Sequence, residues 1–313
     1  MEFGVQIEPQ FGFSFDDVVT IAKTALDKGF SSVWFSDHFM LDTDSTERVL
    51  LDPWLLMTAL VMVNKTIRVG SLVFSQSYRN PALTAKMAAT LDVLSGGRLE
   101  FGIGAGWKEM EYKAYGFEFP DTLTRIEQLA EAIQIIRGIW ENERFSFKGN
   151  HYSVEDVISV PKPVQKPMRI WVGAAAGKRK MLRLTAKYGD GINLAWAYSP
   201  ADCVPKFRRL DKFCRREGRD PSEMLKSVGL WTRFFESEED MEAAIKEGAA
   251  NRGVSEQEYR ERVSSSLWGT ADQMLERLRE YERIGVSHLI LMFPPQQEVE
   301  QIKSIGKGVL SKL

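Results

Sequence analysis

Short apolar runs alternate along the chain with longer segments in which apolar residues recur at helical spacing. Runs such as 32–35 and 288–292 are apolar on both faces, which is typical of parallel strands covered by helices. The alternation repeats eight times. The expected strand and helix pairs are 3–7 with 15–28, 32–36 with 53–63, 67–74 with 81–94, 98–104 with 123–140, 168–173 with 178–188, 191–194 with 200–216, 225–235 with helices from 237 onward, and 287–293 with 298–313.

Eight strand–helix units of this kind predict an α/β protein with a (β/α)8 TIM barrel, whose functional groups lie at the carboxyl ends of the strands. A doubly wound open sheet is the alternative. An open sheet that binds a dinucleotide carries Gly-x-Gly-x-x-Gly at its first turn. The glycine-rich stretch here, 102–107, reads Gly-Ile-Gly-Ala-Gly-Trp and does not match that fingerprint, so the barrel is favoured.

Two segments exceed a minimal barrel. Residues 142–166 are typical of a short hairpin followed by a proline-rich extended connection, and residues 237–270 are charged and helical. Insertions of this size usually cover the mouth of the active site or form an interface. No linker, low-complexity tract or internal repeat interrupts the chain, and we expect one domain over 1–313.

Composition excludes several classes of partner. The chain has 313 residues and a formal net charge of −2, which gives no general attraction to nucleic acid or anionic membranes. Its longest apolar run, 55–63, is too short to span a bilayer, and its start lacks the pattern of a signal peptide. Cys203 and Cys214 are spaced for neither zinc nor a disulfide framework. We expect a cytoplasmic enzyme without a metal, which binds a small-molecule substrate.

Two acidic residues and one histidine are the first candidates for chemistry. His38 follows the second strand, and an imidazole there can face the barrel mouth and move a proton near neutral pH. Asp37 points the other way along the strand, where we expect it to hold the turn or a neighbouring backbone amide beside the binding site. Glu109 follows the fourth strand and is a candidate proton donor, although Glu111 competes for that role.

The glycine-rich strand exit offers a place for a ligand. Backbone without side chains at Gly104 and Gly106, followed by Trp107, would let a flat or phosphorylated group approach closely. Glycines that only ease packing are the alternative.

A second candidate binding segment follows the fifth strand. Small residues there open a helix with three cations in its first turn, so free amides, the positive helix end and Lys178 could hold a dianion. A solvated basic helix start is the alternative. The candidate residues are Gly173, Ala174, Ala175, Ala176, Gly177 and Lys178.

Several motifs occur in a fixed order over nearly the whole chain. They are Trp-Phe-Ser-Asp-His-Phe at 34–39, Tyr-Arg-Asn-Pro at 78–81, the stretch 94–107, Ala-Tyr-Gly at 114–116 with Phe-Pro at 119–120, the proline-rich run 161–167, and Ala-Lys-Tyr-Gly-Asp-Gly at 186–191. Together they resemble the bacterial luciferase-like superfamily. Within it, the pattern most resembles the subgroup that uses the deazaflavin coenzyme F420.

The resemblance implies hydride transfer between F420 and a small alcohol or ketone, imine or activated alkene, with His38 close to the reactive edge of the ring. It also implies a strand bulge with a non-proline cis peptide behind that ring, within Ser71, Leu72 and Val73, and a homodimer through helices 53–63 and 81–94. An FMN-dependent monooxygenase that uses oxygen and a non-catalytic flavin-binding barrel are the alternatives. Three tryptophans near strand ends or in insertions are candidates for a substrate wall, although packing is the commoner role: Trp196, Trp231 and Trp268.

Overall fold

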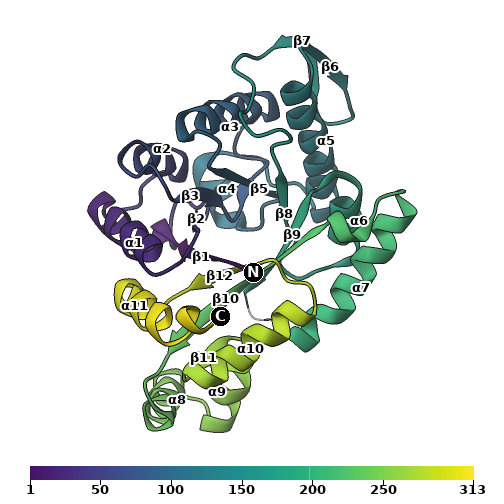
Figure 1. Ribbon diagram of the computed structural model, residues 1–313. Coiled ribbons are helices and arrows are strands. Elements are labelled where there is room, and N and C mark those ends of the chain that lie inside the picture. The colour runs from purple at the N-terminus through teal and green to yellow at the C-terminus, as the bar shows by residue number, and fades with distance from the viewer. Residues whose placement is uncertain (197) are drawn as a thin grey trace.

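The computed structural model describes residues 1–196 and 198–313, which form a closed ring of eight parallel strands surrounded by helices (Figure 1). Strand β12 pairs with β1, and β9 pairs with β10, which closes the ring. The predicted (β/α)8 barrel is therefore confirmed, and the open sheet is excluded. The strands in ring order are β1 (Glu2–Ile7), β2 (Ser32–Phe35), β3 (Arg68–Ser71), β5 (Leu99–Gly104), β8 (Ile170–Gly173), β9 (Gly191–Trp196), β10 (Leu225–Phe234) and β12 (His288–Met292).

Capping residues in the sequence determine where several of the helices begin. Ser14 and Asp17 form a capping box at the start of the first helix, in which each residue's side chain bonds the other's backbone N–H at 3.2 and 2.9 Å. Ser199 and Asp202 repeat that arrangement. The helices around the barrel are α1 (Phe15–Asp27), α2 (Pro53–Val63), α3 (Pro81–Ser95), α5 (Thr122–Glu141), α6 (Arg179–Tyr188), α7 (Pro200–Arg216), α10 (Ala271–Arg283) and α11 (Glu298–Gly308).

The two segments that exceed a minimal barrel form elements outside the ring of eight strands. Strands β6 (Arg144–Lys148) and β7 (Ser153–Ile158) form an antiparallel hairpin, and the Glu131 carboxylate on α5 accepts the N–H groups of 150, 151 and 152 at 2.7 to 2.9 Å. The hairpin is therefore fastened to the outer side of α5 (Figure 1). The second insertion consists of α8 (Glu238–Arg252), α9 (Glu256–Val263) and β11 (Leu267–Gly269), which extends the sheet beside β10.

Shorter elements connect these parts. They are β4 (Phe74–Ser75), α4 (Glu109–Tyr115) and the 3-10 turns η1 (Pro9–Phe11), η2 (Pro221–Glu223) and η3 (Leu310–Lys312). Cys203 and Cys214 are buried in α7 as free thiols. None of the helices formed by the described residues combines the length and apolar character needed to cross a bilayer.

Two tryptophans fill the middle of the barrel. Trp34 and Trp171 meet edge to face with ring centroids 6.2 Å apart. The ring of Trp34 lies over Gly4 and Gly70, where a Cβ atom would come within 2.5 Å of its indole. Since the lumen is packed at this level, chemistry is confined to the carboxyl ends of the strands above it, which we call the mouth.

Candidate functional site

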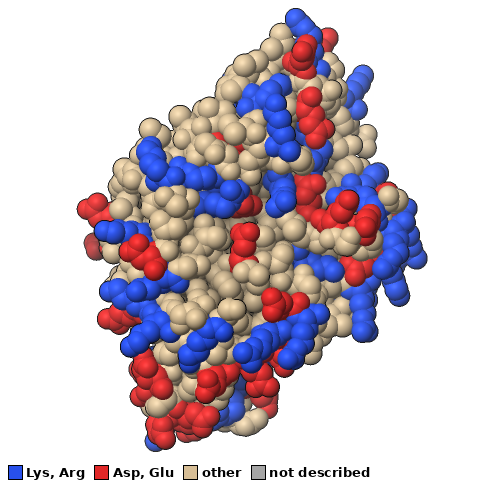
Figure 2. Space-filling model, viewed as in Figure 1, with Lys and Arg blue, Asp and Glu red and all other residues tan. Residues whose placement is uncertain are grey.

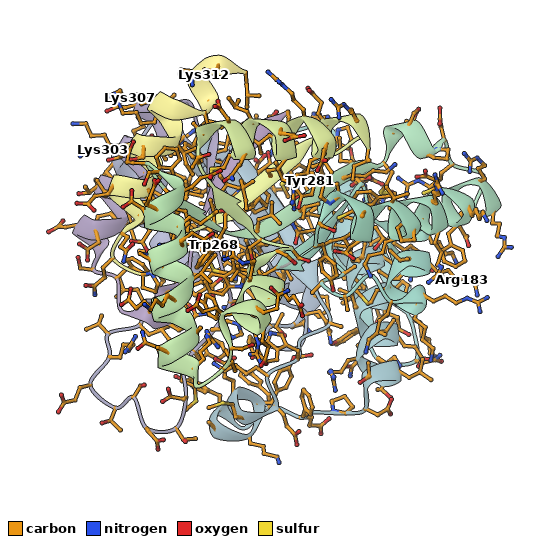
Figure 3. All side chains as sticks on the ribbon, turned by 90° about the horizontal axis from the view of Figure 1, so that it is seen from below. Arg183, Trp268, Tyr281, Lys303, Lys307 and Lys312 are labelled. Carbon is orange, nitrogen blue, oxygen red and sulfur yellow. The ribbon has the colours of Figure 1, made fainter. Side chains whose placement is uncertain are left out.

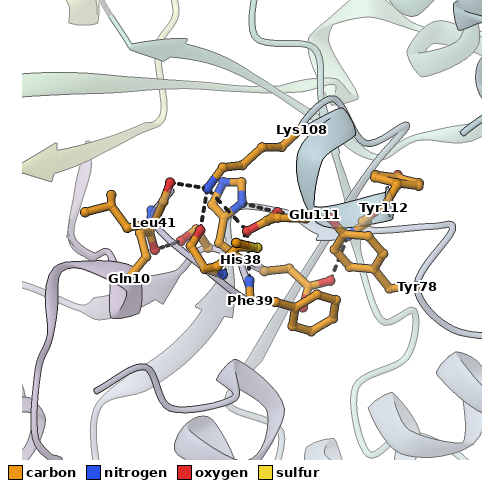
Figure 4. A network of polar contacts seen from close by, with 12 residues as sticks. Gln10, His38, Phe39, Leu41, Tyr78, Lys108, Glu111 and Tyr112 are labelled. Carbon is orange, nitrogen blue, oxygen red and sulfur yellow. Dashed lines mark hydrogen bonds and ion pairs between the residues drawn. The ribbon is translucent and has the colours of Figure 1, made fainter. Parts of the chain in front are cut away.

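A histidine and a buried carboxylate meet at the mouth, brought together from two strand exits. His38 follows β2, and Glu111 lies on α4, which follows β5. Nδ1 of His38 is 2.8 Å from Oε2 of Glu111, whose side chain is fully buried (Figure 4). Because a carboxylate can only accept hydrogen bonds, Nδ1 carries the ring proton and donates a hydrogen bond to Glu111. Nε2 is then the nitrogen left to accept or donate a proton elsewhere.

Glu111 accepts further hydrogen bonds from the protein. Its Oε1 accepts the backbone N–H groups of Phe39 and Met40 at 2.9 and 3.1 Å, and its Oε2 accepts the Tyr78 hydroxyl at 3.0 Å. Burial by itself would raise the pKa of Glu111, but the hydrogen bond and charge of His38, the Met40 N–H and the charge of Lys108 together hold that pKa at about 2. Glu111 is therefore ionised across the physiological range.

Lys108 ties the segment after β5 to the loop after His38. Its Nζ donates to the carbonyl oxygens of Met40 and of Leu41, the latter at 2.8 Å, and lies 3.3 Å from Oε1 of Glu111 (Figure 4). Burial and the nearby Glu111 raise the pKa of Tyr78, so its hydroxyl remains a donor. We use the term His38 network for His38, Tyr78, Lys108 and Glu111. Our sequence reasoning assigned no role to Tyr78 or Lys108, although both lie in or beside the quoted motifs.

Glu109 does not face His38. Its side chain is 53% exposed and pairs with Lys113 at 2.9 Å. Two positions along an α-helix turn a side chain by about 200°, so Glu109 and Glu111 lie on opposite sides of α4. The structure thus brings Glu111 to the histidine, and we transfer the candidate proton-handling role from Glu109 to Glu111.

Asp37 holds the chain next to the site. Its carboxylate accepts both terminal nitrogens of Arg79 at 2.8 and 3.0 Å and the N–H of Ser75 at 2.9 Å. This is the contact to a neighbouring backbone amide that the sequence suggested. Since its oxygens are occupied by the protein, a contribution of Asp37 to cofactor binding would act through β4, to which Ser75 belongs.

The third strand is interrupted where the bulge was predicted. Strand β3 ends at Ser71, the Leu72–Val73 peptide is cis, and pairing resumes with β4. The predicted position of the cis peptide is confirmed. Val73 enters a space left by three glycines: a Cβ atom at Gly104 or Gly173 would lie 2.7 or 2.6 Å from its Cγ2, and one at Gly102 would lie 3.0 Å from its Cγ1.

The glycine-rich exit therefore makes room for the protein's own chain, as the packing alternative expects, and ligand binding at Gly104 and Gly106 stays a prediction. At Gly106 a Cβ atom would lie 1.8 Å from the Tyr112 hydroxyl, and φ is +76°. This left-handed turn directs Trp107 outward, where it is 70% exposed. Its ring meets the His38 ring edge to face at 5.6 Å.

A second buried carboxyl lies at the end of β1. Glu8 accepts from Nε2 of Gln6 at 2.7 Å and from Nε2 of Gln10, and Oε1 of Gln10 accepts the Ser36 hydroxyl at 2.9 Å. Burial raises the pKa of Glu8, against the opposing effects of His38 and these hydrogen bonds. Sequence reasoning missed this group, although three polar residues at alternate positions of 6–10, at the end of a buried strand, could have indicated it.

The segment after β8 leaves the first turn of α6 open. Its N-cap, Lys178, makes no side-chain capping bond, and Lys178, Arg179 and Lys180 are exposed without an ion-pair partner among the described residues. Gly177 has φ +59° and donates its N–H to the carbonyl of Ala174 at 2.5 Å, while Ala175 and Ala176 are exposed. Uncapped N–H groups and cations at a helix start favour an anion.

The three candidate tryptophans occupy different places. Trp196 ends β9 and packs on Gly229, and Trp231 on β10 is 38% exposed. Trp268 belongs to the second insertion (Figure 3). It packs on Phe235 and lines a cavity of about 430 Å³ between α8, α9 and α10. No residue of the His38 network lines that cavity. Among the residues of 1–196 and 198–313, no group of three His, Cys, Asp or Glu side chains is arranged to hold a metal.

Comparisons with known proteins agree with the barrel fold. The family described as luciferase-like monooxygenase matches residues 1–288. The F420-dependent glucose-6-phosphate dehydrogenase of Amycolatopsis mediterranei is 26% identical over 95% of this chain and 94% of its own. The 5,10-methylenetetrahydromethanopterin reductase of Archaeoglobus fulgidus is 26% identical over 100% of both chains. A solved F420-dependent secondary alcohol dehydrogenase in complex with an F420–acetone adduct superposes with a TM-score of 0.82, at 20% identity over 98% of each chain, and so has the same fold.

Proposed function

The chain belongs to the luciferase-like monooxygenase family, and we propose that within this family it transfers a hydride between coenzyme F420 and a small organic substrate. The observation that carries the proposal is His38, held by Glu111 through Nδ1 at a mouth whose wall contains the Leu72–Val73 bulge. The F420-dependent relatives that match nearly the full length of the chain support F420 over FMN.

The residues present fit such a coenzyme. Leu72 and Val73 would hold the ring, because the glycines around Val73 let this apolar segment project toward the barrel axis. Lys178 and the uncapped first turn of α6 would hold the phosphate. When bound, a deazaflavin supplies a ring carbon that accepts or gives a hydride and does not readily activate oxygen.

His38 handles the proton that accompanies the hydride. In the direction of alcohol oxidation, Nε2 accepts the proton of the substrate hydroxyl, and in the reverse direction it returns that proton to the carbonyl oxygen. The ionised Glu111 stabilises the imidazolium that forms, and Tyr78 and Lys108 keep the carboxylate in position. The Trp107 ring contacts the imidazole edge to face beside this network.

A titration with both coenzymes tests the proposal. We expect F420 to bind and its absorbance to change when members of an alcohol, ketone, imine and enone panel are added. Tight FMN binding with substrate-dependent oxygen uptake would instead identify a monooxygenase. Coenzyme binding without turnover on any member of the panel would favour a non-catalytic flavin-binding barrel.

A homodimer in the cytoplasm completes the proposal. Helices α2 and α3 expose a row of large apolar side chains, and patches of that kind mark interfaces in soluble proteins. The two free thiols support a reducing compartment. Replacing Leu55, which is 72% exposed, by Glu should convert the dimer to a monomer in sedimentation experiments. The exposed apolar residues are Leu55, Met62, Val63, Leu83, Val93 and Leu94.

A further inference from the structure

Positive charge is concentrated on one side of the barrel. Residues 178–216 contain eleven Lys and Arg against three Asp, in a chain whose formal net charge is −2. Helices α6 and α7 pack together, and their cations cover the corresponding side of the molecule (Figure 2). The exposed members, which we call the basic face, are Lys178, Arg179, Lys180, Arg183, Lys187, Arg208, Arg209, Lys212, Arg215 and Arg216.

Most of this charge has no partner within the chain. Among the ion pairs that the described residues form, the basic face contributes one, between Arg183 and Glu217 at 3.9 Å. Cations on neighbouring helices repel one another, and at physiological ionic strength the repulsion reaches about 8 Å. Apart from the first turn of α6, where we propose that the coenzyme phosphate binds, the basic face is therefore an unneutralised surface that is available to an anionic partner.

Negative charge is concentrated on the second insertion. Residues 236–263 contain nine Asp and Glu against four Lys and Arg. Helix α9 buries none of its residues, and α8 buries Ala244, Ile245 and Ala249. The outer surface of α8 and α9, which we call the acidic hairpin, is thus free to meet another molecule (Figure 2). Its exposed carboxylates are Glu236, Glu238, Glu239, Asp240, Glu242, Glu247, Glu256, Glu258 and Glu261.

We propose that the acidic hairpin of one copy of this chain docks on the basic face of another. The two surfaces lie on different sides of the same barrel (Figure 1), and none of the described ion pairs joins them within one chain. Their charges are opposite in sign. The carboxylates on α8 and α9 of one copy would face the cations on α6 and α7 of the other.

This contact is separate from the apolar surface of α2 and α3. Exposed ion pairs are individually weak and are screened by salt, so the association is reversible and depends on ionic strength. It would link the proposed homodimers into larger assemblies. The inference does not depend on the proposed hydride transfer, since it requires neither the His38 network nor the first turn of α6, where the coenzyme phosphate is proposed to bind.

A charge swap tests the contact on the full chain. The first variant, Arg208→Glu with Lys212→Glu and Arg215→Glu, removes the basic face on α7 and spares the first turn of α6. The second variant, Glu239→Lys with Glu247→Lys and Glu261→Lys, reverses the acidic hairpin. Sedimentation velocity is recorded at about 20 mM and about 500 mM salt for the wild type, for each variant and for their equimolar mixture.

We expect the wild type to form assemblies at low salt that dissociate at high salt. Neither variant alone should form them, whereas the mixture should, because each variant then meets the opposite charge. Unchanged circular dichroism and an unchanged high-salt sedimentation coefficient control for folding. Salt-independent sedimentation of the wild type, or a mixture that behaves like its components, would overturn the proposal. Binding of a labelled RNA oligonucleotide that the first variant loses, without self-association of the wild type, would assign the basic face to nucleic acid instead.

Discussion

The mouth of the barrel has two sides that are built differently. On one side His38, Glu111, Tyr78 and Lys108 share a connected set of hydrogen bonds around a buried carboxylate. On the other side, at the ends of β9 and β10, lie aromatic rings such as that of Trp231, which is 38% exposed and forms no hydrogen bond with the residues that the structure describes. A connected network of hydrogen bonds holds a proton-transferring side chain in one position. Aromatic surfaces make less directional contacts and can therefore pack against substrates of different shapes. We infer that the His38 side sets the chemistry and the tryptophan side selects the substrate.

The replacement of His38 by Ala should have the largest effect. A general acid or base contributes about 10²- to 10⁴-fold to a rate, so kcat should fall by that factor. The Kd for F420, measured by absorbance titration, should change by no more than a few-fold. A fall in coenzyme affinity equal to the fall in kcat would show that His38 binds the coenzyme and does not move a proton.

The replacement of Glu111 by Gln should come next. Amide for carboxylate keeps the shape of the side chain but removes the charge that stabilises the imidazolium, so we expect kcat to fall about 10- to 100-fold. The Kd for F420 should change by no more than a few-fold, as for His38→Ala. Glu109→Gln is the matched control: this exposed residue on the opposite side of α4 should leave both quantities unchanged.

The same variant changes the pH dependence of stability. The pKa of Glu111 is about 2 in the folded protein, below its ordinary value of 4.5. Its contribution to the free energy of unfolding is complete above pH 4.5 and is lost as the pH falls through 2. Urea unfolding between these values should therefore show a flatter pH dependence for Glu111→Gln than for the wild type. Parallel curves would mean that folding does not lower the pKa of Glu111.

The fold could be predicted from the sequence because its signals are local. Apolar runs, capping residues such as Ser14 and Ser199, and turn glycines each act within a few positions, and the predicted helices 53–63 and 200–216 coincide with α2 and α7. The position of the bulge came from resemblance, since nothing in the residues 71–73 themselves indicates a cis peptide.

The site was predicted less completely, because its contacts join distant segments. Helix α4 has seven residues, too few for periodicity to distinguish Glu109 from Glu111 as the partner of a histidine 73 positions away. A glycine in the sequence indicates that another group comes close to the backbone there, but it does not identify that group. At Gly104 it is Val73, and this identity depends on the pairing of β4 with β5.

The replacement of Gly104 by Ala should destabilise the protein, because it disturbs the packing of Val73 in the bulge at the mouth. Its Cβ would lie 2.7 Å from Cγ2 of Val73, and overpacking of this kind costs about 1–3 kcal/mol in the free energy of unfolding. The double variant with Val73→Ala removes the colliding methyl groups and should recover part of that loss, as a double-mutant cycle would measure. If the losses in the free energy of unfolding from the two single variants simply add, the new methyl group of Gly104→Ala does not collide with Val73.

The smallest expected effect lies on the tryptophan side. Trp231→Ala removes an exposed aromatic surface at the mouth end of β10, and we expect KM for bulky substrates to rise about three- to tenfold while kcat for the smallest substrates is retained. Trp268→Ala is the matched control, because that ring packs on Phe235 in the insertion and should leave KM unchanged. If Trp231→Ala lowered kcat for all substrates and left KM unaltered, the aromatic side would contribute to the chemical step, and the division between the two sides of the mouth would not hold.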